Sequence, residues 1–132
     1  MAFLSWHERY RLGDADIDAQ HQKLFEMVNH FDDVIGMGMP VELGLILEDL
    51  VAFTIVHFRF EEDLLKRIGY PQSTDHQKQH GLLLGQVQDM RSRMIAGGHV
   101  DAKSIVWFLA DWLTNHIIRE DMGYKSYLHP HG

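Results

Sequence analysis

Apolar residues recur at every third or fourth position in four stretches of the chain, which is the spacing of one face of an α-helix. No stretch shows the alternation of apolar and polar residues that is typical of a half-buried β-strand. Three short segments rich in glycine or proline separate the four stretches, namely Gly36–Pro40, Gly69–Pro71 and Gly97–Gly98. Because both residue types end helices, we predict helices at about residues 18–37, 41–68, 74–95 and 101–122.

Short links between consecutive helices favour antiparallel neighbours. The sequence therefore predicts an all-α fold, an antiparallel up-down-up-down four-helix bundle. Residues 1–16 contain Trp6, Tyr10 and Gly13 without a clear period, and we expect them to form an irregular N-terminal arm. The chain has 132 residues and no linker or internal repeat, so we predict one domain over residues 1–132.

The composition excludes several classes of function. Cysteine is absent, which excludes disulfide scaffolds, thiolate zinc sites, iron–sulfur clusters and thiol catalysis. The net charge of −7 argues against nucleic acid or an anionic membrane as the main partner. We find no signal-peptide pattern and no apolar run of the roughly 18 residues that a membrane span needs, and we expect a cytoplasmic protein. Histidine is unusually frequent, with 10 copies against 12 lysines and arginines together.

Seven polar residues share the apolar helix faces or lie about one turn beyond them. They are His21, His57, Glu61, His76, His80, His116 and Asp121. Each of them alone has an ordinary explanation, because a single histidine on an apolar face is usually hydrogen-bonded in the core. The spacing of His57 and Glu61 also suits an ordinary helical pair. Burying the whole set without partners would cost several kcal/mol, so the set needs hydrogen bonds or cations.

The positions of the histidines along the helices argue for cations. His21 lies about 16 residues before the predicted end of its helix, and His57 lies about 16 residues after the start of the next, about 24 Å in each case. In an antiparallel pair these two imidazoles share one level. His80 and His116 repeat the coincidence on the third and fourth helices, at about 15 residues or about 22 Å. The other three members follow about one turn lower, and we predict a metal site at this level of the bundle.

The number and type of donor groups favour two metal ions. Seven side chains exceed the four ligands of a structural zinc site, which usually includes thiolates. They suit two octahedral ions roughly 3.5–4 Å apart, bridged by Glu61 and Asp121. Imidazole with bridging carboxylate favours iron, although copper, manganese or zinc could be loaded artificially. The chain lacks the Glu-x-x-His motif of ferritin-like di-iron proteins, and its excess of imidazole over carboxylate points away from an oxidase.

Five motifs carry a resemblance to a known family. They are Asp18-Ala-Gln-His21, His57-Phe-Arg-Phe-Glu61, Gly69-Tyr-Pro71, His76-Gln-Lys-Gln-His80 and Asp111-Trp-Leu-Thr-Asn-His116, the last followed by Asp121. Together they resemble the hemerythrin family, and most closely its single-domain bacterial members. The resemblance covers nearly the whole chain, including Trp6 and Gly13 of the arm, and none of the family's metal-ligand positions is substituted.

The resemblance implies reversible dioxygen binding at a non-haem di-iron centre, for oxygen carriage, storage or delivery, and no enzymatic activity. It implies that one iron is held by His76, His80 and His116. The other iron would be held by His21 and His57, and both carboxylates would bridge the two ions alongside an oxygen atom from solvent. Dioxygen would bind at the open position of the iron with two histidines.

The resemblance also implies an apolar oxygen pocket. The matching positions are Leu24, Phe58, Trp112 and Leu113, which equally suit plain core packing. Besides dioxygen, an oxygen-consuming enzyme is a candidate partner. Two alternatives stay open, namely oxygen or redox sensing through a separate partner and a di-iron oxidase or peroxidase-type enzyme. No exposed apolar stripe forces association, so we expect a monomer.

Two expectations concern the surroundings of the site. The five-residue step from His116 to Asp121 turns an ideal helix by about 140° from inward, so the last helical turn must be loosened. The remaining histidines are expected to be solvated or to lie at an edge: His7, His30, His99, His129 and His131. The acidic neighbours expected in solvent are Glu62, Asp63 and Glu120.

Overall fold

The computed structural model describes residues 4–37, 40–96 and 101–128, and this part of the chain contains helices and irregular segments but no strands. Four long helices make up most of it. They are α1 (Ala15–Ile35), α2 (Pro40–Arg67), α3 (Ser73–Ile95) and α4 (Ala102–Arg119). Three short elements accompany them: η1 (Glu8–Tyr10), η2 (Asp121–Tyr124) and α5 (Lys125–Leu128). The predicted all-α class is confirmed.

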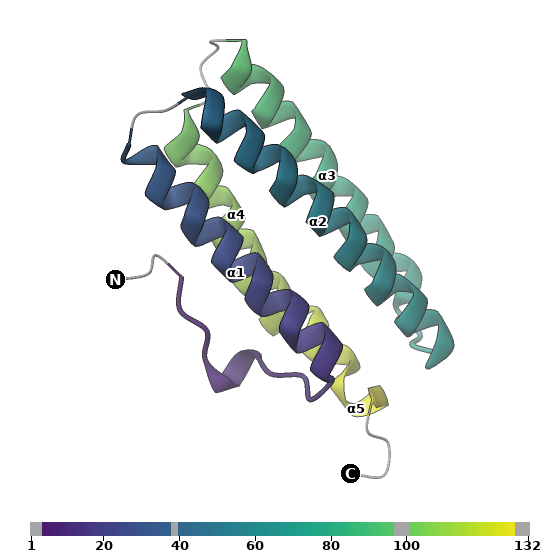
Figure 1. Ribbon diagram of the computed structural model, residues 1–132. Helices are drawn as coiled ribbons and strands as arrows, with labels where there is room; N and C mark the ends of the chain where they lie inside the picture. Colours follow the sequence, from purple (N-terminus) through teal and green to yellow (C-terminus); the bar gives the residue numbers. More distant parts are fainter. Residues whose placement is uncertain (1–3, 38–39, 97–100, 129–132) are drawn as a thin grey trace.

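The four long helices lie side by side, and each runs antiparallel to the one before it (Figure 1). Helix α1 packs against α2 and α4, and α2 packs against α3. The predicted antiparallel four-helix bundle is therefore confirmed. Among the described residues, no helix combines the length and the apolar character that crossing a membrane requires.

The N-terminal arm is tied to the start of α1. This helix begins earlier than predicted because the carboxylate of Asp14 accepts the backbone N–H of Ile17 at 2.9 Å and caps the first turn. The buried carboxylate of Asp18 accepts the backbone N–H groups of Leu12 at 2.8 Å and Gly13 at 3.1 Å. Gly13 has a φ of 90°, a conformation that favours glycine. The arm is irregular, as predicted, but it is fixed to the bundle.

Two clusters of buried apolar side chains fill the bundle, and we call them the large core and the small core. The large core includes Leu24 and Phe58, and the small core includes Ile17 and Leu64. On α1 the buried His21 falls between Ile17 and Leu24, and on α2 a buried carboxylate falls between Phe58 and Leu64. The predicted polar level therefore lies inside the bundle, with apolar packing on both sides.

Candidate metal centre

The seven predicted ligands meet in the interior, from all four long helices and η2. They are His21 on α1, His57 and Glu61 on α2, His76 and His80 on α3, His116 on α4 and Asp121 at the start of η2. Each side chain is buried, with at most 6% of its residue surface exposed. The level predicted from counting residues along the helices is the level at which they meet.

Glu61 lies at the centre of this group, and its two carboxylate oxygens face different histidines. Oε2 lies 3.4 Å from Nε2 of His57 and 3.7 Å from Nε2 of His21. Oε1 lies 3.1 Å from Nε2 of His80 and pairs closely with Nε2 of His76. One carboxylate therefore faces two separate pairs of imidazoles.

Asp121 repeats this arrangement from the opposite end of the chain. Its Oδ2 lies 3.2 Å from Nε2 of His21. Its Oδ1 lies 2.9 Å from Nε2 of His76 and 3.0 Å from Nε2 of His116. Both carboxylates thus stand between a histidine group on α1 and α2 and a histidine group on α3 and α4.

The backbone after α4 explains how Asp121 reaches the interior. Helix α4 ends at Arg119, before the predicted residue 122, and the N–H of Glu120 still bonds to the carbonyl of His116 at 2.8 Å. Residues Asp121–Tyr124 then form a turn of 3₁₀-helix, which winds more tightly than the α-helix. The α-helix therefore ends before Asp121 and a tighter turn follows, in place of the loosened turn that was expected from the five-residue spacing, and the predicted end of the fourth helix was too late.

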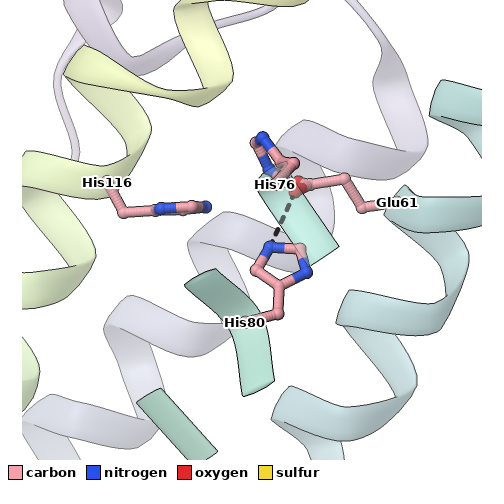
Figure 2. A group of neighbouring side chains, drawn as sticks. All are labelled: Glu61, His76, His80 and His116. Atoms are coloured by element: carbon pink, nitrogen blue, oxygen red, sulfur yellow. Dashed lines mark hydrogen bonds and ion pairs between the residues drawn. The ribbon is translucent and has the colours of Figure 1, made fainter. Parts of the chain in front are cut away.

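The interior of the group holds donor atoms without hydrogen bonds. Nε2 of His80 and His116, both ring nitrogens of His21 and both oxygens of Asp121 are buried and make no hydrogen bond. Buried polar atoms without partners are rare because desolvation is not compensated. The donor atoms form two sets, and within each set all atoms lie within 4.8 Å of one another. Glu61 belongs to both sets. Figure 2 shows the set on α2, α3 and α4 converging on one point. Cations at these points would satisfy the unpaired atoms, so the residues fit metal ions.

Comparison with known sequences decides the family. The model of the family described as the Hemerythrin HHE cation binding domain matches residues 12–128. The chain belongs to the hemerythrin family. Family and fold together indicate non-haem iron binding, and oxygen binding is the usual function of such proteins.

Relatives cover nearly the whole chain. The bacteriohemerythrin of Pseudomonas aeruginosa (strain LESB58) is 37% identical over 124 residues, covering 94% of this chain and 80% of that protein. The bacteriohemerythrin of Methylococcus capsulatus is 30% identical over 125 residues, covering 94% of this chain and 95% of that protein. A crystal structure of wild-type hemerythrin is 30% identical with a TM-score of 0.89, covering 96% of this chain and 98% of that chain. The resemblance to the hemerythrin family is therefore confirmed.

In this hemerythrin the carboxylates are held ionised. Burial raises the pKa of Glu61, but its contacts with His21, His57 and other histidines outweigh burial and hold the pKa well below its ordinary value. Burial and the charge of Glu61 likewise raise the pKa of Asp121, yet His116 and His21 lower it far more. The interior therefore keeps two negative charges, which cations or protons must balance.

Without a cation, protons on the histidines supply that balance. Burial lowers the pKa of His21, but Asp121 and Glu61 outweigh this effect and raise it to about 9. The same two carboxylates raise the pKa of His76 to about 10 against the effect of burial. Burial prevails at His57, where the contact with Glu61 offsets it only in part and the pKa is lowered. Metal ions and protons thus compete for the same nitrogens.

Hydrogen bonds outside the centre fix two of the imidazoles. Nδ1 of His80 donates to Oε2 of Glu62 at 2.9 Å, and Nδ1 of His57 donates to Oε1 of Gln20 at 2.6 Å. Because both acceptors need the proton on Nδ1, each ring directs the lone pair of Nε2 inward. The expectation that Glu62 is solvated was therefore wrong, since its side chain is only 18% exposed and binds a candidate ligand.

A fully buried tyrosine completes the surroundings of Glu61. The hydroxyl of Tyr124 donates to Oε2 of Glu61 at 3.1 Å. Burial and the charges of Glu61 and Asp121 raise the pKa of Tyr124, which keeps the phenol protonated. Sequence reasoning missed both Tyr124 and Gln20. Gln20 lies within the motif that ends at His21, and Tyr124 follows Asp121 by three residues, but spacing alone does not say where such a side chain points.

The four residues of the predicted oxygen pocket line one small internal cavity. It has a volume of about 20 Å³, and its walls also include Val28, Leu50, Thr54, Leu83 and Leu109. The ring of Phe58 stacks on His80 with centroids 3.6 Å apart, and Trp112 stacks on His116 at 4.3 Å. The cavity therefore adjoins the centre through two aromatic rings.

Of the residues expected in solvent or at an edge, all but Glu62 and Glu120 are exposed where the structure describes them. His7 and His30 are exposed, as is Asp63, and Glu120 is half-buried. His99, His129 and His131 lie outside the described residues.

Proposed function

We propose that the seven buried residues hold two iron ions and that the protein binds dioxygen reversibly at this centre. One observation carries the proposal. Glu61 and Asp121 each direct one oxygen toward His21 or His57 on one side and the other oxygen toward histidines of α3 and α4 on the other side. A carboxylate placed in this way can bridge two ions, whereas a single ion would leave one oxygen of each without a partner.

The histidines divide unequally between the two sides. His76, His80 and His116 would hold one ion, and His21 and His57 would hold the other. With both carboxylates shared, the second ion would have one protein ligand fewer than the first, which would leave a position for dioxygen. When bound, two ferrous ions supply the two electrons that dioxygen takes up.

The residues around the cavity favour dioxygen over water. Among them Thr54 carries a hydroxyl group, and this hydroxyl donates to the carbonyl of Leu50 at 2.7 Å rather than to the cavity. A buried water needs two to four polar partners, and a space of roughly 10–15 Å³ is the least that holds one. The cavity of about 20 Å³ has the room but offers an apolar lining. Dioxygen needs no hydrogen bonds there, so it can enter where water is disfavoured.

The role that follows is oxygen carriage, storage or delivery to an oxygen-consuming enzyme, with no catalytic turnover. We propose that the protein acts as a monomer in the cytoplasm. Oxygen sensing through a partner and an oxidase or peroxidase-type activity are the competing roles.

An optical titration with counting of iron tests the proposal. The reduced, iron-loaded protein is titrated with dioxygen and then sparged with inert gas. We expect two irons per chain and a visible absorption band that appears with dioxygen and disappears on sparging. Oxidation without reversal would favour the enzyme or redox-sensor role, and one iron or none would refute the seven-ligand assignment.

A further inference from the structure

Three of the four tyrosines form a row from Glu61 to the molecular surface. Tyr124 is fully buried and its hydroxyl donates to Oε2 of Glu61 at 3.1 Å. The rings of Tyr124 and Tyr70 lie 5.9 Å apart between centroids, and those of Tyr70 and Tyr127 lie 5.2 Å apart. Tyr127 is 41% exposed. The row therefore connects a candidate iron ligand to solvent through ring contacts.

A glycine leaves room for Tyr70, the middle residue of this row. A Cβ atom at Gly123 would lie 2.7 Å from the hydroxyl oxygen of Tyr70, so the position tolerates no side chain without displacing that ring. Tyr70 lies between α2 and α3, whereas Tyr124 and Tyr127 belong to η2 and α5. Residues far apart in the sequence thus meet in one row. Phenylalanine would fill the same space, so packing alone does not explain the three hydroxyl groups.

We infer that Tyr124, Tyr70 and Tyr127 carry oxidising equivalents from the metal centre to the surface when the protein meets hydrogen peroxide. The inference rests on the proposed function, because the iron ions would transfer the electrons to peroxide. Such a path gives the centre an additional activity, the reduction of peroxide at the expense of surface phenols. It would also spare the buried histidines, which are the nearest oxidisable groups.

The electrons and protons balance as follows. One hydrogen peroxide takes up two electrons and two protons, its O–O bond breaks, and two waters leave. Each electron comes from a tyrosine: Tyr124 gives an electron to the centre while its phenol proton shifts within the hydrogen bond to Oε2 of Glu61. The two protons that peroxide takes up come from water. Tyr70 then transfers an electron to the oxidised Tyr124, and the proton shared with Glu61 returns to the Tyr124 phenol.

Tyr127 then reduces the oxidised Tyr70 in the same way, and the phenol proton that Tyr127 loses at the surface goes to water. The Tyr127 phenoxyl radical takes a hydrogen atom from Tyr127 of a second protein molecule, and the restored row then delivers the second electron. The Tyr127 phenoxyl radicals of the two molecules couple through a new C–C bond to give dityrosine. The net reaction converts one peroxide and two tyrosines to two waters and one dityrosine.

Trp112 is the competing exit from the centre. Its indole stacks on His116 with centroids 4.3 Å apart and is half-buried. If oxidising equivalents left the centre by this route, oxidation products would form on Trp112 and the tyrosines would stay intact. The identity of the oxidised residue therefore separates the two routes.

The test treats the iron-loaded protein with hydrogen peroxide and measures dityrosine fluorescence, covalent dimer formation and oxidised residues by peptide mass mapping. We expect a dimer linked through Tyr127, with no dityrosine from the metal-free protein. Tyr70→Phe breaks the row without touching a candidate ligand, and it should abolish the dityrosine signal. Tyr127→Phe should abolish the dimer and leave the oxidation on Tyr70. Tyr10→Phe is the matched control and should leave the signal unchanged, since Tyr10 packs against Trp6 and Phe25 away from the row.

The outcomes separate this inference from the proposed function. Failure to bind two irons, or to bind dioxygen reversibly, would refute the proposed function. If the protein binds two irons and binds dioxygen reversibly, but Tyr70→Phe forms as much dityrosine as the unchanged protein, electron transfer along the row is refuted and the proposed function is not. Oxidation found on Trp112 or Tyr10 in place of Tyr127 would refute it equally. Tyr124→Phe, with iron counted, then shows whether the hydroxyl next to Glu61 is needed for the transfer.

Discussion

The carboxylate of Glu62 accepts a hydrogen bond from Nδ1 of His80 at 2.9 Å, while its neighbour Glu61 faces Nε2 of the same ring. Two consecutive glutamates on α2 therefore hold one imidazole from opposite sides. The outer contact fixes the tautomer and orientation that ligation requires. This relationship was not expected for Glu62, and it leads to the first prediction.

Glu62→Ala, which removes the acceptor for Nδ1 of His80, should weaken iron binding without removing a candidate ligand. Loss of a hydrogen bond to the outer nitrogen of a ligating histidine typically lowers metal affinity by about 10–100-fold. Competition with a chelator measures the change in affinity. Asp63→Ala removes an adjacent but exposed carboxylate and is the control. Equal affinities for both variants would show that the Glu62 contact does not support the ligand.

His57→Ala should leave the side of the centre with two histidines vacant or mixed in occupancy. It removes one of the two imidazoles there, while the three histidines of α3 and α4 remain. Iron counting and the dioxygen titration measure the effect, and we expect less than two irons per chain and no normal dioxygen binding. His30→Ala removes an exposed histidine and should behave as the unchanged protein. Two irons and normal binding in His57→Ala would refute the ligand scheme.

Leu113→Ala should speed autoxidation, because a smaller side chain admits water beside the bound dioxygen. Leu113 is buried and lines the cavity next to Phe58 and Trp112. Removing its side-chain carbons should also lower the free energy of unfolding by about 2–5 kcal/mol. The decay of the oxygenated absorption band gives the rate, and thermal unfolding gives the stability. Ile118→Ala, at a residue of the same helix that is 44% exposed, is the control. A rate in Leu113→Ala no faster than that of the control would count against the pocket assignment.

Metal binding should release protons at pH 7. In the metal-free protein the pKa values of about 9 for His21 and about 10 for His76 keep both imidazoles protonated at this pH. A metal ligand must be neutral, so binding should release up to one proton from each ring. Titration calorimetry in buffers of different ionisation enthalpy measures this number. Metal affinity should rise with pH until these groups are deprotonated, and binding without proton release would refute the assignment of both rings.

The same pKa values predict the stability of the metal-free protein. Both histidines have a higher pKa when folded than the unfolded value of about 6.5. Their contribution to the free energy of unfolding is therefore full below pH 6.5 and is lost as pH rises through 9 to 10. Denaturant titrations of the metal-free protein across this range should show falling stability. A flat profile would show that the two rings are not charged in the fold.

The helical pattern and the positions of the candidate ligands could be predicted because both follow from regular geometry. A rise of 1.5 Å per residue fixes the height of His21 and His57 as soon as the helix ends are known. The spacing of apolar residues indicated which helix faces point inward, and glycine and proline indicated where the helices end. The bundle and the group of seven residues could therefore be predicted without coordinates.

The contacts around the ligands were not readable in this way. Gln20 and Glu62 act through side chains that bend toward a ring on another helix, and no period marks them. Tyr124 reaches Glu61 only because the chain tightens into η2 after Arg119. The end of α4 was misplaced for the same reason, since the sequence there still has helical character while the backbone changes its winding.

The polar level between the large core and the small core has a consequence for cooperativity. The buried apolar side chains fall into two clusters on either side of this level, because charged and polar side chains occupy its interior, and the partly buried Met122 packs against both clusters. Cations held there would link all four helices at one height and join the two cores into a single unfolding unit. Without them, the end that contains the small core is expected to open first and independently. Bound metal would then couple the unfolding of the two ends, and loss of metal would cause local unfolding at the end with the small core before global unfolding.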